Sequence, residues 1–319
     1  MPENTALPAS SGQASASVGV RPRASWPCLL IAVAMAVHAG LAVDAARRLT
    51  VTHDEYWHLP VGLLNLETGR FGFDNLNPPL VRMWAALPLL ATSVELPVPD
   101  EPADPTAVGD QFVEAAGGNY VRWLTCGRAM IVLLSVGTGV LLTHWAWRLF
   151  GRNAAVLVAV LWAFSPTVLA GASLVTTDLA AAGAFAGTLY ALWAFIVQPG
   201  WKQAAVLGLC LGIAQLVKYT SAVLYPLCVL MWCVFTLLAW RDRRRQLAES
   251  STPVDQQSSL PDGPVTAATW PEQGGLRTAG QLAGKWCAIL ALSLLVLNLG
   301  YLFQGAFSGR AVIPSGRHY

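Results

Sequence analysis

The sequence is short of charge. Only 12% of its 319 residues are Asp, Glu, Lys or Arg, whereas a soluble globular chain carries about 25%. Apolar residues make up 55% of the chain, and they gather in long runs that contain no charged residue. Because about 20 apolar residues cross the hydrocarbon core of a bilayer, such runs predict membrane-spanning helices rather than a soluble core.

Two further scarcities narrow the function. The six cysteines show no Cys-x-x-Cys or Cys/His metal spacing, and no secreted disulfide framework can be read from them. Most of them lie inside apolar runs, where a cysteine is expected to act as a small apolar side chain. No basic patch is interleaved with stacking aromatic residues, so the sequence does not predict nucleic-acid binding.

Seven uncharged runs are candidates for membrane spans, although the fifth is short. They are Ala24–Val43, Ala129–Trp147, Asn153–Thr177, Leu179–Trp201, Gln203–Val217, Tyr219–Trp240 and Trp286–Gly309. The sequence therefore predicts an all-α polytopic membrane protein with about seven transmembrane helices.

Basic residues between the runs orient the chain, because cytoplasmic loops are enriched in Lys and Arg. If the N-terminus is cytoplasmic, the basic turns at Arg148, Arg152 and Lys202 all fall inside. The strongest basic cluster, Arg241–Arg245, falls inside as well. We therefore expect an integral protein of a bacterial inner membrane with a cytoplasmic N-terminus.

The runs divide the chain into four parts. Residues 1–23 are rich in Ser, Ala, Pro and Gly and are expected to form a disordered cytoplasmic tail. Residues 24–240 form the main transmembrane module, which includes a long external loop at 44–128. Residues 241–284 are predicted to be a flexible cytoplasmic loop, and residues 285–319 a last transmembrane helix with a short external tail.

The external loop holds two predicted helices. Residues 54–66 have apolar residues at helical spacing, and Thr68-Gly69 is a typical helix end. The segment that starts at Pro78 begins with prolines suited to a helix start. We expect residues 80–96 to lie at the external interface, because a further span there would invert every later orientation.

Carboxylates lie beside the predicted membrane boundary. Asp54 and Glu55 follow the first run, and Asp178 ends the third, so the topology places all three on the external side. An ionisable residue at such a boundary indicates a functional site. A plainer interpretation is also open, in which Asp54 and Asp178 are helix caps and Glu55 occupies a favourable first turn.

Other polar residues have two interpretations each. Asp54 and His58 are four residues apart and would share one face of a helix, where they could orient a general base or bind a metal with a third group. Lys218 lies between two apolar runs, as a snorkelling lysine or as an anion clamp. His38 and His144 lie inside apolar runs and are expected to be packed polar residues.

The order of these motifs resembles a known family. A span is followed by DEYWHLPVGLLNLETGRF and NPPLVRMWAALPLL, then by an Arg-led span closing in WRLFG, then by FSPTVLAGASLVTTDLAAAGAF and GLCLGIAQLVKYTS. Over residues 24–240 this order resembles the GT-C glycosyltransferases of the dolichyl-phosphate-mannose/aminoarabinose transferase type. The resemblance implies a GT-C transmembrane module. It also implies transfer of a sugar from a polyprenyl-phosphate carrier to a lipid, glycan or protein acceptor on the extracytoplasmic face.

The resemblance also implies roles for individual residues. Asp54 matches the family's first-loop catalytic acid position and would be the general base, with Glu55 beside it as a catalytic or supporting contact. Asp178 matches the second external acidic position and would position substrate or a metal. Lys218 would contact the donor phosphate, and Arg128 matches a commonly basic start of its span and would contact substrate.

One motif departs from the aminoarabinose transferases, which carry an acidic and a basic residue just before its proline. Asn77 and Pro78 stand at those places in this sequence. Asn77 and Arg82 are therefore expected to contact substrate. His58 and Asp74 are the expected ligands of a divalent metal, whose identity the sequence does not give.

Two alternatives stay open at this point. Enzymes of this family usually continue well past seven spans, so the chain could be a truncated and non-catalytic member or one that needs a partner. The other alternative is a transporter or flippase, which would normally place ionisable residues or broken helices at the bilayer midplane. The polar residues of this sequence gather instead at one predicted face, which favours the transferase.

Overall fold

The computed structural model describes residues 26–100, 103–250 and 275–304. The predicted disordered tail and most of the predicted cytoplasmic loop lie outside these residues. All secondary structure in these residues is helical, and no strand occurs among them. The elements in chain order are α1 (Trp26–Arg48), α2 (His53–Thr68), α3 (Leu80–Ala86), η1 (Leu87–Ala91), α4 (Pro105–Ala116), η2 (Gly117–Asn119), α5 (Tyr120–Phe150), α6 (Arg152–Phe164), α7 (Pro166–Ala172), α8 (Asp178–Val197), α9 (Trp201–Val217), η3 (Tyr219–Val223), α10 (Leu224–Ser250) and α11 (Gly275–Gly300).

The helices confirm an all-α polytopic membrane protein. Within the described residues, five helices are long and apolar enough to cross a membrane, namely α1, α5, α8, α10 and α11. The pair α6 and α7 would be a sixth span, bent by 61°. The short fifth run of the sequence forms α9, which is too short to count by itself but packs against both α8 and α11.

The break between α6 and α7 has a local cause. Ser165 is extended, with φ −67° and ψ 120°, because the following Pro166 disfavours the helical conformation of the residue before it. The last carbonyls of α6 therefore lack helical partners. The His38 ring satisfies one of them, since its Nδ1 lies 3.2 Å from the Ala163 oxygen, while its Nε2 lies 2.8 Å from Ser135 Oγ. His38 is thus a packed polar residue, as its apolar run predicted.

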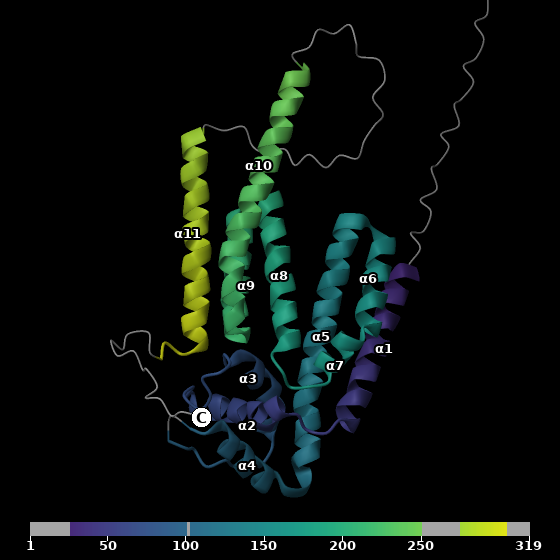
Figure 1. The fold of residues 1–319 in the computed structure, drawn as a ribbon, viewed down its shortest axis with the longest axis vertical. Coiled ribbons are helices and arrows are strands. Elements are labelled where there is room, and N and C mark those ends of the chain that lie inside the picture. The colour runs from purple at the N-terminus through teal and green to yellow at the C-terminus, as the bar shows by residue number, and fades with distance from the viewer. Residues whose placement is uncertain (1–25, 101–102, 251–274, 305–319) are drawn as a thin grey trace, which may run out of the picture.

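The long helices lie side by side, and α2, α3 and α4 lie across one end of them (Figure 1). We call this the α2 end of the bundle. The segments that join α7 to α8 and α9 to α10 also reach the α2 end, whereas α10 extends past its neighbours at the opposite end (Figure 1). The helix α3 with η1 is a short apolar element rather than a span candidate, as predicted for residues 80–96.

The helices on either side of the predicted cytoplasmic loop, α10 and α11, extend into it. That loop was predicted to start at residue 241, but α10 continues to Ser250 and α11 already begins at Gly275. For α10 the reason is that Arg, Gln and Ala have high helix propensity, so this helix can continue beyond the apolar run that anchors it. Hydrophobicity defines the span, but it does not define the end of the helix.

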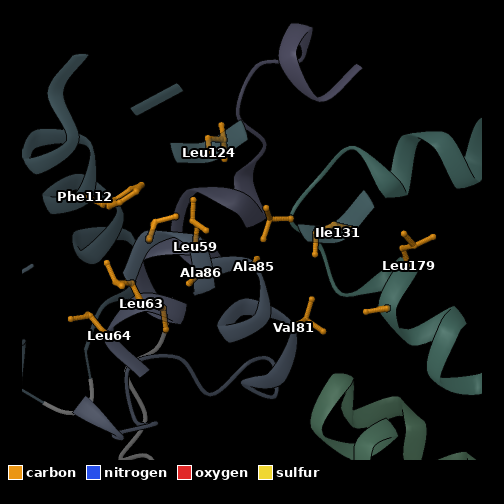
Figure 2. Close-up of a cluster of buried hydrophobic side chains, with 14 of the residues drawn as sticks. Leu59, Leu63, Leu64, Val81, Ala85, Ala86, Phe112, Leu124, Ile131 and Leu179 are labelled. Atoms are coloured by element: carbon orange, nitrogen blue, oxygen red, sulfur yellow. The ribbon is translucent and has the colours of Figure 1, made fainter. Parts of the chain in front are cut away.

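An apolar core joins the α2 end to the bundle. Leu59, Leu63 and Leu64 of α2 are fully buried, and α2 packs so closely on α3 that a Cβ at Gly62 would lie 2.1 Å from the Arg82 carbonyl oxygen. Figure 2 shows these leucines with the core residues of the neighbouring helices, Val81, Ala85, Ala86, Phe112, Leu124, Ile131 and Leu179. The helices across the α2 end are therefore a packed layer that can hold side chains in fixed positions.

Candidate functional site

The start of α2 is fixed by a capping box. Glu55 Oε2 accepts hydrogen bonds from the Thr52 amide at 3.1 Å and from the Thr52 hydroxyl at 2.9 Å. The helix ends at Gly69, with φ 65°, as the Thr68-Gly69 pair predicted. The interpretation of Asp54 as the cap is wrong, because Thr52 occupies that position. Asp54 is exposed in the first turn, where the helix dipole favours a negative charge.

Glu55 is buried in an ion pair with Arg128. The Arg128 Nε and Nη2 atoms each lie 2.7 Å from a different Glu55 oxygen, and the two side chains are 2% and 0% exposed. The Val175 amide donates a further hydrogen bond to Glu55 Oε1 at 2.8 Å. Burial by itself would raise the pKa of Glu55, but Arg128 and the Val175 amide outweigh it and the pKa is lowered. Glu55 is thus held as a carboxylate.

Arg128 uses all five of its N–H donors inside the protein. Besides Glu55, it donates to the carbonyl oxygens of Ala46, Leu49 and Thr50 at 2.7–2.8 Å. This guanidinium therefore joins the end of α1, the start of α2, and α5. The expected contact of Arg128 with substrate does not fit this geometry, because no donor is left for a phosphate. Glu55 and Arg128 hold these parts of the chain together.

His58 lies next to this ion pair on α2 and is buried. Its Nδ1 lies 3.2 Å from the Val175 carbonyl oxygen, and its Nε2 lies 3.3 Å from Asn77 Nδ2. Burial lowers the pKa of His58. A neutral ring with its proton on Nδ1 suits both contacts, since it donates to Val175 and accepts from Asn77. The charges of Asp54, Asp74 and Arg82 all act on this ring.

Asp74 and Arg82 form a second buried ion pair. Arg82 Nη1 pairs with Asp74 Oδ2, Nη2 donates to the Asp74 carbonyl at 3.1 Å, and Nε donates to Asn65 Oδ1 at 2.8 Å. Asp74 Oδ1 also accepts from the Leu76 amide at 2.8 Å. The pair fixes the segment between α2 and α3, and with it Asn77, against the core.

The donor set does not fit the expected divalent metal. His58 uses both ring nitrogens, and Asp74 uses both carboxylate oxygens, in contacts within the protein. Among the described residues, no group of three or more His, Cys, Asp and Glu side chains is arranged to hold a metal ion. His58 and Asp74 are therefore structural contacts within the protein.

Lys218 and Asp178 form a third ion pair at the α2 end. Lys218 Nζ lies 2.5 Å from Asp178 Oδ1, and the two side chains are 31% and 74% exposed. Asp178 lies three residues after Val175, in the first turn of α8, and Thr177 rather than Asp178 occupies the cap position. The structure thus brings together two residues that the sequence had placed on the same side from separate runs.

Two tyrosines near this pair were missed by the sequence analysis. The hydroxyl of Tyr219, which follows Lys218, lies 3.4 Å from the hydroxyl of Tyr301 at the end of α11. Tyr301 also packs against Phe71, with 5.4 Å between ring centroids. Both phenols are close enough to interact electrostatically with Arg82. The sequence motif KYTS held Tyr219, but nothing in the sequence linked it to Tyr301.

An apolar groove of about 320 Å³ begins beside the Lys218–Asp178 pair. It is bordered by α3, α5, α8 and α9, and α8 contributes only small side chains there, Ala180, Gly183, Ala184 and Gly187. Val217 and Ala180 line the groove, so Lys218 and Asp178 lie one and two residues from its wall. Exposed polar groups and an apolar groove thus meet at one place.

This fold and site define a class: a polytopic helical membrane protein with carboxylates and a cation at one end of an apolar groove. Residues 124–252 match the model of the dolichyl-phosphate-mannose-protein mannosyltransferase family, part of the GT-C superfamily. The match bears out the predicted resemblance for this part of the chain, not for the motifs before residue 124, and it suggests a membrane glycosyltransferase of the GT-C type. It includes Arg128, Asp178 and Lys218, while α2 lies before it. No curated protein and no solved structure matches the chain.

The first prediction concerns the buried ion pair. Replacing Arg128 with Met should lower the free energy of unfolding by about 3–5 kcal/mol, because Glu55 would remain as a buried carboxylate without its partner. The measurement is the thermal and denaturant unfolding of the purified protein in detergent.

The matched control is Arg48→Met, which breaks the exposed Arg48–Asp44 pair at 2.9 Å. This change should cost at most about 1 kcal/mol. Equal losses for the two variants would contradict the assigned role of Arg128.

The second prediction concerns His58. Its pKa is lowered from 6.5 in the folded protein, so the unfolded chain binds the proton more readily. The contribution of His58 to the free energy of unfolding should therefore be fully present above pH 6.5 and should decrease as the pH falls below that value. Glu55, with a pKa lowered from 4.5, acts only at lower pH. His58→Gln should reduce the change in the free energy of unfolding between about pH 7.5 and 5.5. If the free energy of unfolding of this variant changed with pH as it does in the wild type, other groups would be its cause.

Proposed function

We propose that the protein transfers a sugar from a polyprenyl-phosphate carrier to an acceptor on the extracytoplasmic side of the membrane. One observation carries the proposal, namely the apolar groove that ends beside the Lys218–Asp178 pair at the α2 end of the bundle. A lipid-linked donor needs both features, an apolar surface for its chain and a polar site at the membrane boundary for its head group.

The donor fits the two parts of this site. The polyprenyl chain would lie in the groove, where the small side chains of α8 leave room for a branched hydrocarbon. The phosphate would then lie at the groove end, within reach of the Lys218 ammonium group. A cation there stabilises the negative charge that develops on the departing polyprenyl phosphate. Arg82 and Arg128 are both occupied in buried pairs, so Lys218 is the cation we assign to the phosphate.

Asp54 is the proposed general base. Its carboxylate is exposed, while the adjacent Glu55 is locked by Arg128, so the start of α2 holds Asp54 in place. As the acceptor hydroxyl oxygen attacks the anomeric carbon, Asp54 takes the hydroxyl proton. The bond between that carbon and the phosphate oxygen breaks, and the polyprenyl phosphate leaves. Asp178 positions the sugar at the groove end, and Asn77 contributes through its contact with His58.

The side of the membrane follows from charge. The basic cluster Arg241–Arg245 lies on α10 toward the end of the bundle opposite to α2 (Figure 1). Since basic clusters favour the cytoplasm, the α2 end is proposed to face outward, with the start of α1 on the cytoplasmic side of a bacterial inner membrane. Lipid, glycan and protein remain the acceptor classes.

One observation bears on the transporter alternative. Broken helices are typical of transporter substrate sites, and the α6–α7 pair is broken. However, the carbonyl freed at this break is bound by His38, and the apolar groove is lined by other helices. We assign the break a structural role, because α7 leads directly into the segment in which Val175 contacts Glu55 and His58.

The third prediction tests the function. Reconstituted wild-type protein should release sugar from at least one member of a panel of labelled polyprenyl-phosphate sugars. Asp54→Asn should reduce this release by about 100-fold or more, because it removes the proton acceptor. Asp100→Asn is the control, since Asp100 is exposed on the connector before α4 and should leave release unchanged. Transfer that survives Asp54→Asn would refute the base assignment.

A further inference from the structure

The three ion pairs at the α2 end are of two kinds. Glu55–Arg128 and Asp74–Arg82 have side chains at most 2% exposed, and several hydrogen bonds hold each pair. Lys218–Asp178 is different, because one contact joins the two side chains and Asp178 is 74% exposed. Exposed pairs of this kind contribute little to stability. Lys218 and Asp178 can therefore separate at little cost to the fold.

The position of the exposed pair is also particular. Lys218 follows the last residue of α9, and Asp178 is the first residue of α8, so their contact bridges the two helices. Val217 and Ala180, beside them, belong to the wall of the groove. The bridge therefore crosses the end of the groove, where the proposed function requires the donor phosphate.

We propose that Asp178 competes with the donor phosphate for Lys218. In this arrangement the Asp178 carboxylate occupies the anion position on the lysine until a phosphate in the groove displaces it. The exchange breaks one ion pair and forms another, so no covalent bond changes and no proton needs to move. This inference rests on the proposed function, because it assumes that a phosphate-bearing lipid enters the groove.

The Asp178 carboxylate remains stabilised after it has lost its contact with Lys218. Asp178 stays in the first turn of α8, where the helix dipole favours its negative charge whether or not Lys218 is its partner. Once released, it is free to accept a hydrogen bond from a hydroxyl of the donor sugar. The same phosphate would therefore anchor the donor and deliver the residue that positions its sugar.

Competition predicts that removing the Asp178 charge increases, rather than decreases, the affinity for the donor phosphate. Asp178→Asn should strengthen the binding of a polyprenyl monophosphate by about two- to five-fold, the range expected for removal of one exposed ion pair. The same variant should slow sugar release, because the positioning carboxylate is lost. A purely structural ion pair, or a metal held by Asp178, would instead make binding weaker in Asp178→Asn.

The experiment measures equilibrium binding of a labelled polyprenyl monophosphate to the full chain in neutral phosphatidylcholine nanodiscs. Lys218→Met should weaken binding, and Asp178→Asn should have no further effect in the Lys218→Met background, because Asp178 acts only through the lysine. Asp44→Asn is the matched control, since it breaks an exposed pair that does not border the groove. The corresponding polyprenol, which has no phosphate, should not distinguish the variants.

The outcomes separate this inference from the proposed function. If the wild type and all variants fail to bind the monophosphate, the donor assignment falls and the inference falls with it. If the wild type binds it but Asp178→Asn binds equally or more weakly, only the competition is overturned. Unfolding midpoints of all variants, measured in the same nanodiscs, show whether a loss of binding comes from a loss of fold.

Discussion

The buried Glu55–Arg128 ion pair is the contact on which the rest of the site depends. A charge removed from water must be paired and fully hydrogen-bonded, and the Arg128 guanidinium of α5 meets that requirement by reaching four residues in three other parts of the chain. Those parts are the end of α1, the linker that follows it, and the start of α2. Glu55 adds a fourth through the Val175 amide. This network fixes the start of α2, which carries Asp54, and the segment with Val175, which leads to Asp178.

The α2 end combines fixed and exchangeable contacts, and the division follows burial. Arg82, Arg128 and His58 are buried and have partners within the protein, so they hold the backbone of the site in place. Asp54 is exposed at the start of α2, and Asp178 and Lys218 reach solvent next to residues that line the apolar groove, so their side chains are free to move. Catalysis by positioned groups needs both kinds, because a reacting side chain gains its effect from a rigid surrounding.

Much of the architecture could be predicted from the sequence, because uncharged apolar runs located the long helices, although they gave neither α4 nor the break of the third run into α6 and α7. The end of α2 at Gly69 was predictable as well, since its signal is local. The role of Arg128 was not, because its carbonyl partners lie about 80 residues earlier and backbone acceptors leave no trace in side-chain chemistry. The contacts of His58 with Val175 and Asn77 escaped for the same reason. Residue type therefore identified the polar cluster, but only the fold could separate its positioning members from its exposed ones.

The central claim is that the groove beside Lys218 and the polar α2 end form one donor site. The most direct test is photo-crosslinking of a polyprenyl monophosphate that carries a diazirine in its chain, followed by peptide mapping. The account predicts labels on α3, α8 and α9, at residues such as Trp84, Ala184 and Ile213 that line this groove. An apolar pocket at α10 and α11, lined by Trp232 and Trp286, offers a built-in comparison. Labels confined to that pocket, or spread evenly over all helices, would contradict the account.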